Sequence, residues 1–189
     1  MRPSLADTNG FGKTAGLGTA TEATLAVMEP ITVRRMDPDD WRVWRGVRLA
    51  ALEESPDAFA STLARELAFE EEIWRGRMSG PGVHVMSFAS QQPMGIAASF
   101  VPDDSPPELV SMWVRPEWRS RQVGAALVNE VLMWARENAY AEVRLWVVEG
   151  NAGALRLYEN TGFEPTGQSQ AHPTDPAETE VRMVHRLTR

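Results

Sequence analysis

The 189-residue sequence contains no cysteine. This absence excludes disulfide bonds, a thiol nucleophile and cysteine-based zinc sites, and it fits a reducing compartment, so we expect a cytoplasmic protein. Only three histidines are present, His84, His172 and His185, and none has the H-x-x-x-H or H-E-x-x-H spacing of a zinc-binding helix. We therefore predict no metal site.

The sequence also lacks a long apolar run and an excess of positive charge. No segment approaches the roughly 18 apolar residues that a membrane span needs, so no membrane association is expected. With 19 basic and 26 acidic residues the formal net charge is −7, which argues against nonspecific nucleic-acid binding. The length and the 43% apolar content allow one domain with a substantial core.

Regular patterning begins only after residue 27. Residues 1–27 are rich in glycine, threonine and alanine, show no periodicity and lack the features of a secretory signal. We predict a flexible tail over 1–27 and one domain over 28–189, with Met28 as a candidate natural start.

The patterned part alternates between strand-like and helix-like segments. Strands are predicted over 31–36, 83–89, 94–101, 108–114, 143–148, 163–166 and 179–187, with a turn at 91–93. Helices are predicted over 41–54, 65–78, from Val123 onward, and over 152–160. This alternation indicates an α/β domain.

The most informative segment joins strand 108–114 to the helix that starts at Val123. It contains two arginines, Arg119 and Arg121, and the small residues Gly124 and Ala126. A helix start has unpaired N–H groups and the positive end of the helix dipole, so an anion can bind there. The segment predicts a phosphate-binding turn, and a plain strand-to-helix turn is the alternative.

A second segment lies one strand downstream, from Asn151 to Phe163. Its residues Ala154, Leu157 and Tyr158 share one helical face. Taken alone, Asn151 is a helix N-cap and Tyr158 is a half-buried core residue.

Together the two segments resemble the GNAT N-acetyltransferase superfamily, which uses acyl-coenzyme A. Residues 121–126 match the pattern Q/R-x-x-G-x-G/A, and residues 151–163 match the later asparagine, tyrosine and Gly-Phe pattern. The resemblance spans about 30–187. One departure is Gln122, where many relatives have another glycine; we expect it to narrow the turn but leave the backbone donors available.

The resemblance implies a GNAT-like α/β fold, classed by some schemes as α+β. The implied sheet is mixed and twisted, with six to seven strands and about four helices. Its fourth and fifth strands, 108–114 and 143–148, splay apart at one end to admit the pantetheine arm.

The resemblance also implies acetyl-CoA as co-substrate. The implied binding residues are Met112, Trp113, Val114, Arg119, Arg121, Gln122, Val123, Gly124, Ala125, Ala126, Asn151, Ala154, Leu157 and Tyr158. By this analogy the backbone of 112–114 pairs with the pantetheine amides. N–H groups of 122–126 then hold the pyrophosphate with help from both arginines.

The implied reaction is direct transfer of an acetyl group to a primary amine in a ternary complex. Tyr158 is the candidate general acid that faces the departing sulfur, and Glu108 is the candidate base, with Glu149 as an open alternative. The amine belongs to a small molecule or a protein, and the protein is a monomer or a homodimer.

The first two predicted helices are expected to frame the acceptor pocket. Their acids either attract a cationic amine or form a solvated face; they are Glu53, Glu54, Asp57, Glu66, Glu70, Glu71 and Glu72. Phe59 and Trp74 either contact the acceptor or pack in the core.

Two other classes of function stay open. One is a noncatalytic regulator that binds acyl-CoA. The other is an unrelated nucleotide-binding α/β domain, although the G-x-G-x-x-G fingerprint and the Walker loop are both missing.

Overall fold

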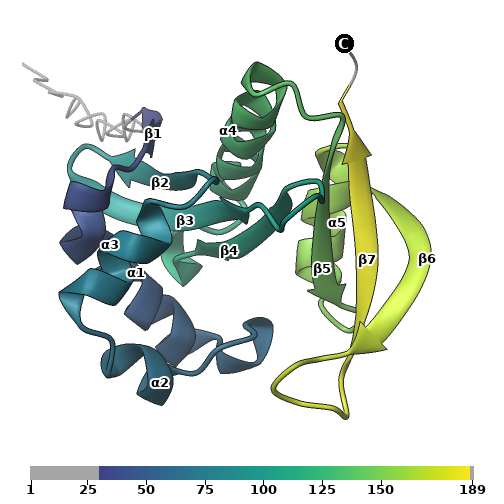
Figure 1. Ribbon diagram of the computed structural model, residues 1–189, viewed down its shortest axis with the longest axis horizontal. Helices are drawn as coiled ribbons and strands as arrows, with labels where there is room; N and C mark the ends of the chain where they lie inside the picture. The colour runs from purple at the N-terminus through teal and green to yellow at the C-terminus, as the bar shows by residue number, and fades with distance from the viewer. Residues whose placement is uncertain (1–29, 188–189) are drawn as a thin grey trace, which may run out of the picture.

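A seven-stranded sheet forms the centre of the protein in the computed structural model, which describes residues 30–187 (Figure 1). The strands are β1 (Ile31–Arg35), β2 (His84–Ala89), β3 (Gln92–Phe100), β4 (Glu108–Val114), β5 (Glu142–Val148), β6 (Glu164–Ala171) and β7 (Thr179–Arg186). Their order in the sheet is β1-β2-β3-β4-β5-β7-β6. Only β4 and β5 pair in parallel, so the sheet is mixed, as predicted.

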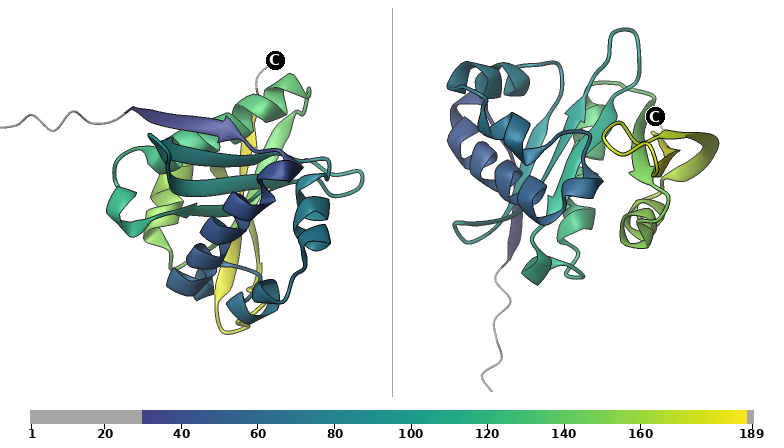
Figure 2. Two further views of the ribbon diagram at one scale, coloured as in Figure 1. Left: turned by 90° about the vertical axis from the view of Figure 1, so that its left-hand side faces the viewer. Right: turned by 90° about the horizontal axis from the view of Figure 1, so that it is seen from below.

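Helices cover both faces of this sheet (Figure 2). The first three are α1 (Trp41–Glu54), α2 (Leu63–Leu67) and α3 (Glu71–Met78), and the other two are α4 (Val123–Glu137) and α5 (Ala152–Asn160). Short 3-10 turns, η1 (Pro38–Asp40), η2 (Pro56–Ala58) and η3 (Pro116–Trp118), precede α1, α2 and α4.

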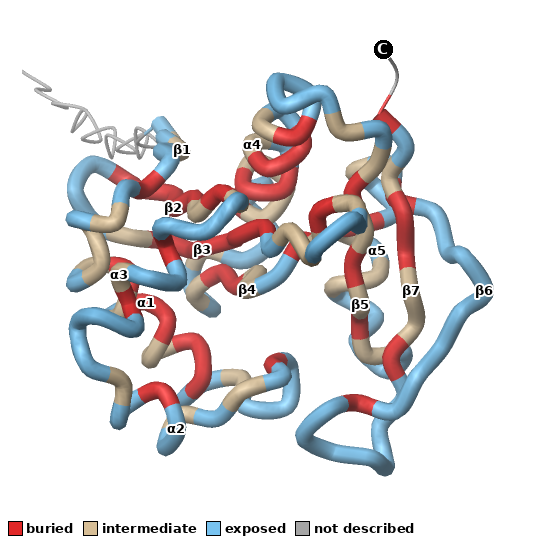
Figure 3. The backbone as a smooth tube through the Cα atoms, in the orientation of Figure 1, coloured by how far each residue is buried: buried red, intermediate tan, exposed pale blue. Residues whose placement is uncertain are grey.

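The strand period of two divides the core into two clusters, one on each face of the sheet. In β2, Val85 packs with the α4 and α5 cluster, whereas its neighbour Met86 packs with the α1 and α3 cluster. Ala97 and Ile96 divide in the same way in β3. Both faces of β2 and β3 are therefore buried, as the tube in Figure 3 shows.

Strands β4 and β5 meet at one end only. Their single paired position is Glu108 with Arg144, and the Arg144 N–H donates to the carbonyl of Pro107 at 2.9 Å. Strand β5 pairs with β7 along its whole length, at seven positions from Glu142 to Val148. The predicted splay is confirmed.

Strand β4 also contains a bulge that the sequence did not indicate. Ser111 has a φ of 57°, and the register with β3 shifts between Ile96 and Ala98. A bulge redirects the side chains that follow it and is common beside active sites.

The single helix predicted over 65–78 is wrong, because two helices occupy this segment and bring the described total to five. Glu70 is extended, with a ψ of 165°, and it starts α3 with Glu71 and Glu72 in the first turn. Acidic residues at that position complement the positive end of a helix, so these acids begin a new helix.

Two strands differ from their predicted bounds by more than one residue. The turn lies at Ser90–Gln91 instead of 91–93, and Pro93 belongs to the start of β3, where its missing N–H is tolerated. Strand β6 extends to Ala171, well beyond 163–166, because an edge strand exposed on every residue needs no apolar alternation. The predicted tail over 1–27 lies outside the described residues.

Candidate active site

A cavity of about 650 Å³ opens beside the splayed strands. Residues 108–112 of β4, Trp146 of β5 and Tyr158 of α5 line one part of it, and Arg48 of α1 and Arg77 of α3 line another. This volume lies within the usual range for small-molecule sites, which is roughly 300–1,000 Å³. The cavity therefore brings the two predicted catalytic residues, Glu108 and Tyr158, into one site.

Tyr158 is buried on α5 and packs edge to face against Phe163, with ring centroids 5.8 Å apart. Within residues 30–187 its hydroxyl has no hydrogen-bond partner. Burial raises the pKa of this phenol above its ordinary value of 10. The hydroxyl consequently stays protonated at neutral pH and is available as a hydrogen-bond donor.

Glu108 is the first residue of β4, at the point where β4 and β5 still pair. Its carboxylate accepts a hydrogen bond from Nη2 of Arg182 on β7 at 2.8 Å, which orients it. The alternative base Glu149 is exposed and does not line the cavity. Of the two candidate bases, Glu108 alone lines the cavity.

The predicted phosphate-binding turn has two residues in the left-handed region, Ser120 with a φ of 60° and Gln122 with a φ of 63°. Helix α4 begins directly afterwards, so the N–H groups of residues 123–125 have no acceptor within the described chain. The Ala126 N–H, by contrast, donates to the carbonyl of Gln122 at 3.0 Å. Fewer backbone N–H groups are therefore free to bind an anion than the five predicted at residues 122–126.

Gly124 has a packing role in addition to the predicted one. A Cβ atom at this position would lie 3.1 Å from Cδ2 of Leu157 and 3.3 Å from Cε of Met112. The absent side chain lets the start of α4 approach both α5 and β4 closely, which keeps the turn near the splayed strands.

The two arginines of the turn have different surroundings. Arg119 donates from Nη2 to Glu54 at 2.6 Å and from Nε to the carbonyl of Val114 at 3.0 Å. Arg121 is exposed, lies over the ring of Trp118 at 5.2 Å and has no ion-pair partner in the described chain. Arg121 is therefore the uncompensated charge at this turn.

Asn151 caps α5, since its side-chain oxygen accepts the N–H of Ala154 at 3.0 Å. This is the structural role that an N-cap asparagine ordinarily has. Of the other residues predicted on this helix, Leu157 is half-buried and contacts the position of Gly124.

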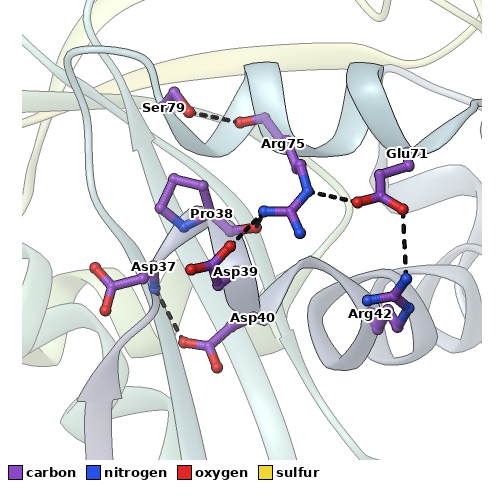
Figure 4. Close-up of polar contacts among 8 residues, drawn as sticks. All are labelled: Asp37, Pro38, Asp39, Asp40, Arg42, Glu71, Arg75 and Ser79. Atoms are coloured by element: carbon purple, nitrogen blue, oxygen red, sulfur yellow. Dashed lines mark hydrogen bonds and ion pairs between the residues drawn. The ribbon is translucent and has the colours of Figure 1, made fainter.

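The acidic residues of the first helices do not face the cavity, since none of the seven lines it. Figure 4 shows one reason: Glu71 is engaged by Arg42 at 3.4 Å and by Arg75 at 2.6 Å, and Arg75 also contacts Asp39 at 2.5 Å. Phe59 does line the cavity, whereas Trp74 is a core residue.

Several cavity residues carried no recognisable signal in the sequence. Glu180 of β7 is buried, lines the cavity and accepts a hydrogen bond from Nε2 of Gln170 at 2.9 Å. Trp146 and Arg48 also line it. The alternation along β5 and β7 would have placed Trp146, Glu180 and Arg182 on one face, and this is the signal that could have found them.

The comparisons with known proteins agree with this architecture. The sequence model described as "Acetyltransferase (GNAT) family" matches residues 47–163, which include both predicted motifs. The chain belongs to the GNAT acetyltransferase family.

Among curated relatives, human N-acetyltransferase 8 is 39% identical over 62 residues, which cover 33% of this chain and 27% of that protein. Across the curated relatives the match spans only 25% to 49% of their own length.

Solved structures match over most of the chain. The putative acetyltransferase yncA of Salmonella typhimurium, solved with its cofactor acetyl-CoA, has a TM-score of 0.68 at 18% identity and covers 85% of this chain and 95% of its own. The ribosomal-protein-S18-alanine N-acetyltransferase of Escherichia coli has a TM-score of 0.63 at 16% identity, covering 85% and 96%. Such likenesses show that the GNAT fold is shared.

Among residues 30–187, no helix is both long and apolar enough to cross a membrane.

Proposed function

We propose that this protein is an N-acetyltransferase that moves an acetyl group from acetyl-CoA to a primary amine by direct attack in a ternary complex. The observation that carries the proposal is the position of Tyr158 and Glu108 in one cavity, where β4 and β5 separate. Membership of the GNAT family supports the same reaction.

The donor site is proposed along β4 and the start of α4. Trp113 and Val114 pair with β3, and none of residues 112–114 pairs with β5, so one backbone edge is free for the pantetheine amides. The side chain of Trp113 donates to Glu54 at 2.9 Å, which leaves its backbone as the proposed contact. Asn151, Ala154 and Leu157 would lie beside the donor on α5.

The pyrophosphate fits the turn that precedes α4. The N–H groups of residues 123–125 and the uncompensated charge of Arg121 offer donors to an anion at a helix start. Charge-assisted hydrogen bonds of this kind are stronger than neutral ones. The fit explains a local basic site in an acidic protein.

In the proposed reaction a neutral amine attacks the thioester carbonyl, the C–S bond breaks, and the thiolate leaves. Glu108 takes the proton that the amine loses, directly or through water. The raised pKa of Tyr158 makes complete proton transfer to a thiolate, whose thiol has a pKa of about 8.5, uphill. Tyr158 is therefore proposed to stabilise the thiolate mainly by hydrogen bonding.

Replacing Tyr158 tests this assignment. Tyr158→Phe is expected to lower kcat about tenfold to a hundredfold, because a hydrogen bond to a charged group is lost, while the affinity for acetyl-CoA stays unchanged. Thiol release with a panel of amines measures turnover, and thermal stabilisation by acetyl-CoA measures binding.

The chain has a matched control in its other tyrosine. Tyr140 lies outside the cavity, so Tyr140→Phe is expected to have full activity. Equal turnover of both variants would remove Tyr158 from the mechanism. Failure to bind any acyl-CoA would reject the function, and binding without turnover across the panel would favour a noncatalytic regulator.

A further inference from the structure

The cavity has an excess of positive charge at the end formed by α1 and α3. Arg48 and Arg77 both line it, and both bind the same carboxylate, that of Glu66. Arg48 holds Glu66 through Nε at 3.1 Å and Nη2 at 2.9 Å, and Arg77 approaches it to 3.4 Å. Two guanidinium groups thus share one carboxylate, which leaves one positive charge uncompensated.

Arg48 also has an unused donor. Its side chain is 5% exposed, and Nη1 is buried without a hydrogen-bond partner. The guanidinium stacks on Phe59, 4.4 Å from the ring centroid, but this contact supplies no oxygen acceptor. A buried arginine donor without an acceptor is costly, and arginine forms strong, often bidentate hydrogen bonds with a carboxylate.

Arg77 is the accessible member of the pair. Its side chain is 43% exposed, and its only ion-pair partner among residues 30–187 is Glu66. His84 lines the same end, and burial, followed by the charge of Arg77, lowers its pKa to about 4. His84 is therefore neutral at pH 7, and the charge at this end comes from the arginines.

Two acids, Glu108 of β4 and Glu180 of β7, line the same cavity. The charge of Glu108 is matched by Arg182, but Glu180 is held by the neutral amide of Gln170. Nε2 of the buried His172 lies 3.9 Å from the Glu180 carboxylate, beyond hydrogen-bond distance. Tyr158 lines this cavity too, so an amine bound by Glu180 would lie in the cavity where acetyl transfer is proposed.

We propose that the acetyl acceptor is an amine that also carries a carboxylate, as a free amino acid does. Its carboxylate would lie at Arg48 and Arg77, and its amine at Glu180 and Glu108. The apolar residues Phe59, Phe100 and Trp146 also line the cavity and suit an apolar side chain. This inference rests on the proposed acetyltransferase function and narrows its substrate class.

Acceptors that differ only in the carboxylate test the inference on the full-length protein. Phenylalanine, phenylalaninamide and phenethylamine share one skeleton, as do leucine, leucinamide and isoamylamine. We expect kcat/KM to be about tenfold to a hundredfold higher for each free amino acid than for its amide or amine, as the loss of a charged hydrogen bond predicts. The amide carries the more easily deprotonated amine, so a preference for the acid cannot come from amine basicity.

A variant locates the effect within the cavity. Arg77→Gln removes the accessible cation. Because the Arg77 side chain is exposed, we expect the variant to stay folded, and a thermal melt checks this directly. The ratio of kcat/KM for amino acid to amine should fall about tenfold, mainly through KM, with unchanged stabilisation by acetyl-CoA. Arg65→Gln is the control, because Arg65 is exposed on α2 and has no ion pair in the described chain.

The outcomes separate this inference from the proposed function. Turnover that is equal or faster for amines without a carboxylate overturns the inference but leaves the acetyltransferase standing. An Arg77→Gln variant that lowers activity equally for acid and amine also overturns it. If no acceptor reacts and acetyl-CoA does not bind, the proposed function itself fails.

Discussion

At the scale of single residues, Gln122 has an unusual backbone conformation. Its φ of 63° lies in the left-handed region, which a side chain with a Cβ disfavours. This is the position singled out in the sequence because many GNAT proteins have glycine there, and glycine adopts a positive φ without Cβ strain. The departure noted in the sequence therefore costs strain and leaves the backbone donors of residues 123–125 in place.

Gln122→Gly is expected to stabilise the protein by up to about 1 kcal/mol, because relief of the Cβ strain outweighs the added freedom of the unfolded chain. Urea unfolding measures the change. Gln91→Gly is the matched control, since Gln91 lies in an exposed turn without a positive φ and should gain nothing. Equal effects of the two changes would contradict the strain argument.

At the scale of elements, Glu54 connects the end of α1 to β4 and the phosphate-binding turn. Its carboxylate accepts hydrogen bonds from Ser55, from Nη2 of Arg119 at 2.6 Å and from Nε1 of Trp113 at 2.9 Å. These hydrogen bonds, with that from Ser55 the largest, lower the pKa of Glu54 to about 2. The ionised carboxylate thus holds three separate elements together.

This lowered pKa predicts acid sensitivity. A carboxyl group whose pKa is lower in the folded state contributes stability above its unfolded pKa of 4.5, and the contribution is lost as the pH falls to about 2. Glu54→Gln should therefore show a smaller decrease in Tm between pH 4.5 and pH 2 than the unchanged protein. Thermal melts across this window measure it.

The adjacent acid provides the control for that experiment. Glu53 is exposed on the same helix and has no ion pair among the described residues, so Glu53→Gln should retain the full decrease. If Glu54→Gln and Glu53→Gln gave the same pH dependence, the contacts of Glu54 would have no role in acid stability.

At the scale of the whole molecule, the splay leaves the two halves of the sheet weakly joined. Strands β4 and β5 share one paired position, Glu108 with Arg144. The ion pair of Arg182 with Glu108 adds a second connection, from β7 to β4, with both side chains about four-fifths buried. The same opening that admits the proposed donor therefore makes this pair a structural contact.

Removing that connection is expected to cost stability. Arg182→Gln should lower the free energy of unfolding by about 1–3 kcal/mol. This value lies between the cost of breaking an exposed ion pair and the cost of breaking a fully buried one. Arg186→Gln, on the same strand, removes an exposed pair with Glu164 and should cost less than about 0.5 kcal/mol. Urea unfolding of both variants provides the comparison, and similar losses would show that the pair does not join the two halves.

Local sequence patterns were sufficient to predict many of the helices and strands of this protein. Helix α1, strand β4 and helix α5 have the predicted bounds, because each has strong periodicity and a clear start or end signal. Edge strand β6 and the break between α2 and α3 were missed, since an exposed strand has no apolar alternation and a run of acids resembles a continuing helix. Among candidate site residues, Tyr158 and Glu108 could be selected before their proximity was known.

The sequence by itself determined the two motifs and the strand and helix order of the GNAT fold, because helix starts, caps and apolar periods depend on residues close together in the chain. Only the tertiary structure decided which charges meet. None of the seven acids of the first helices lines the cavity, and Arg48, Arg77 and Glu180 line it instead. Pairing between side chains from α1, α3 and β7 depends on how the elements pack, and no local pattern records it.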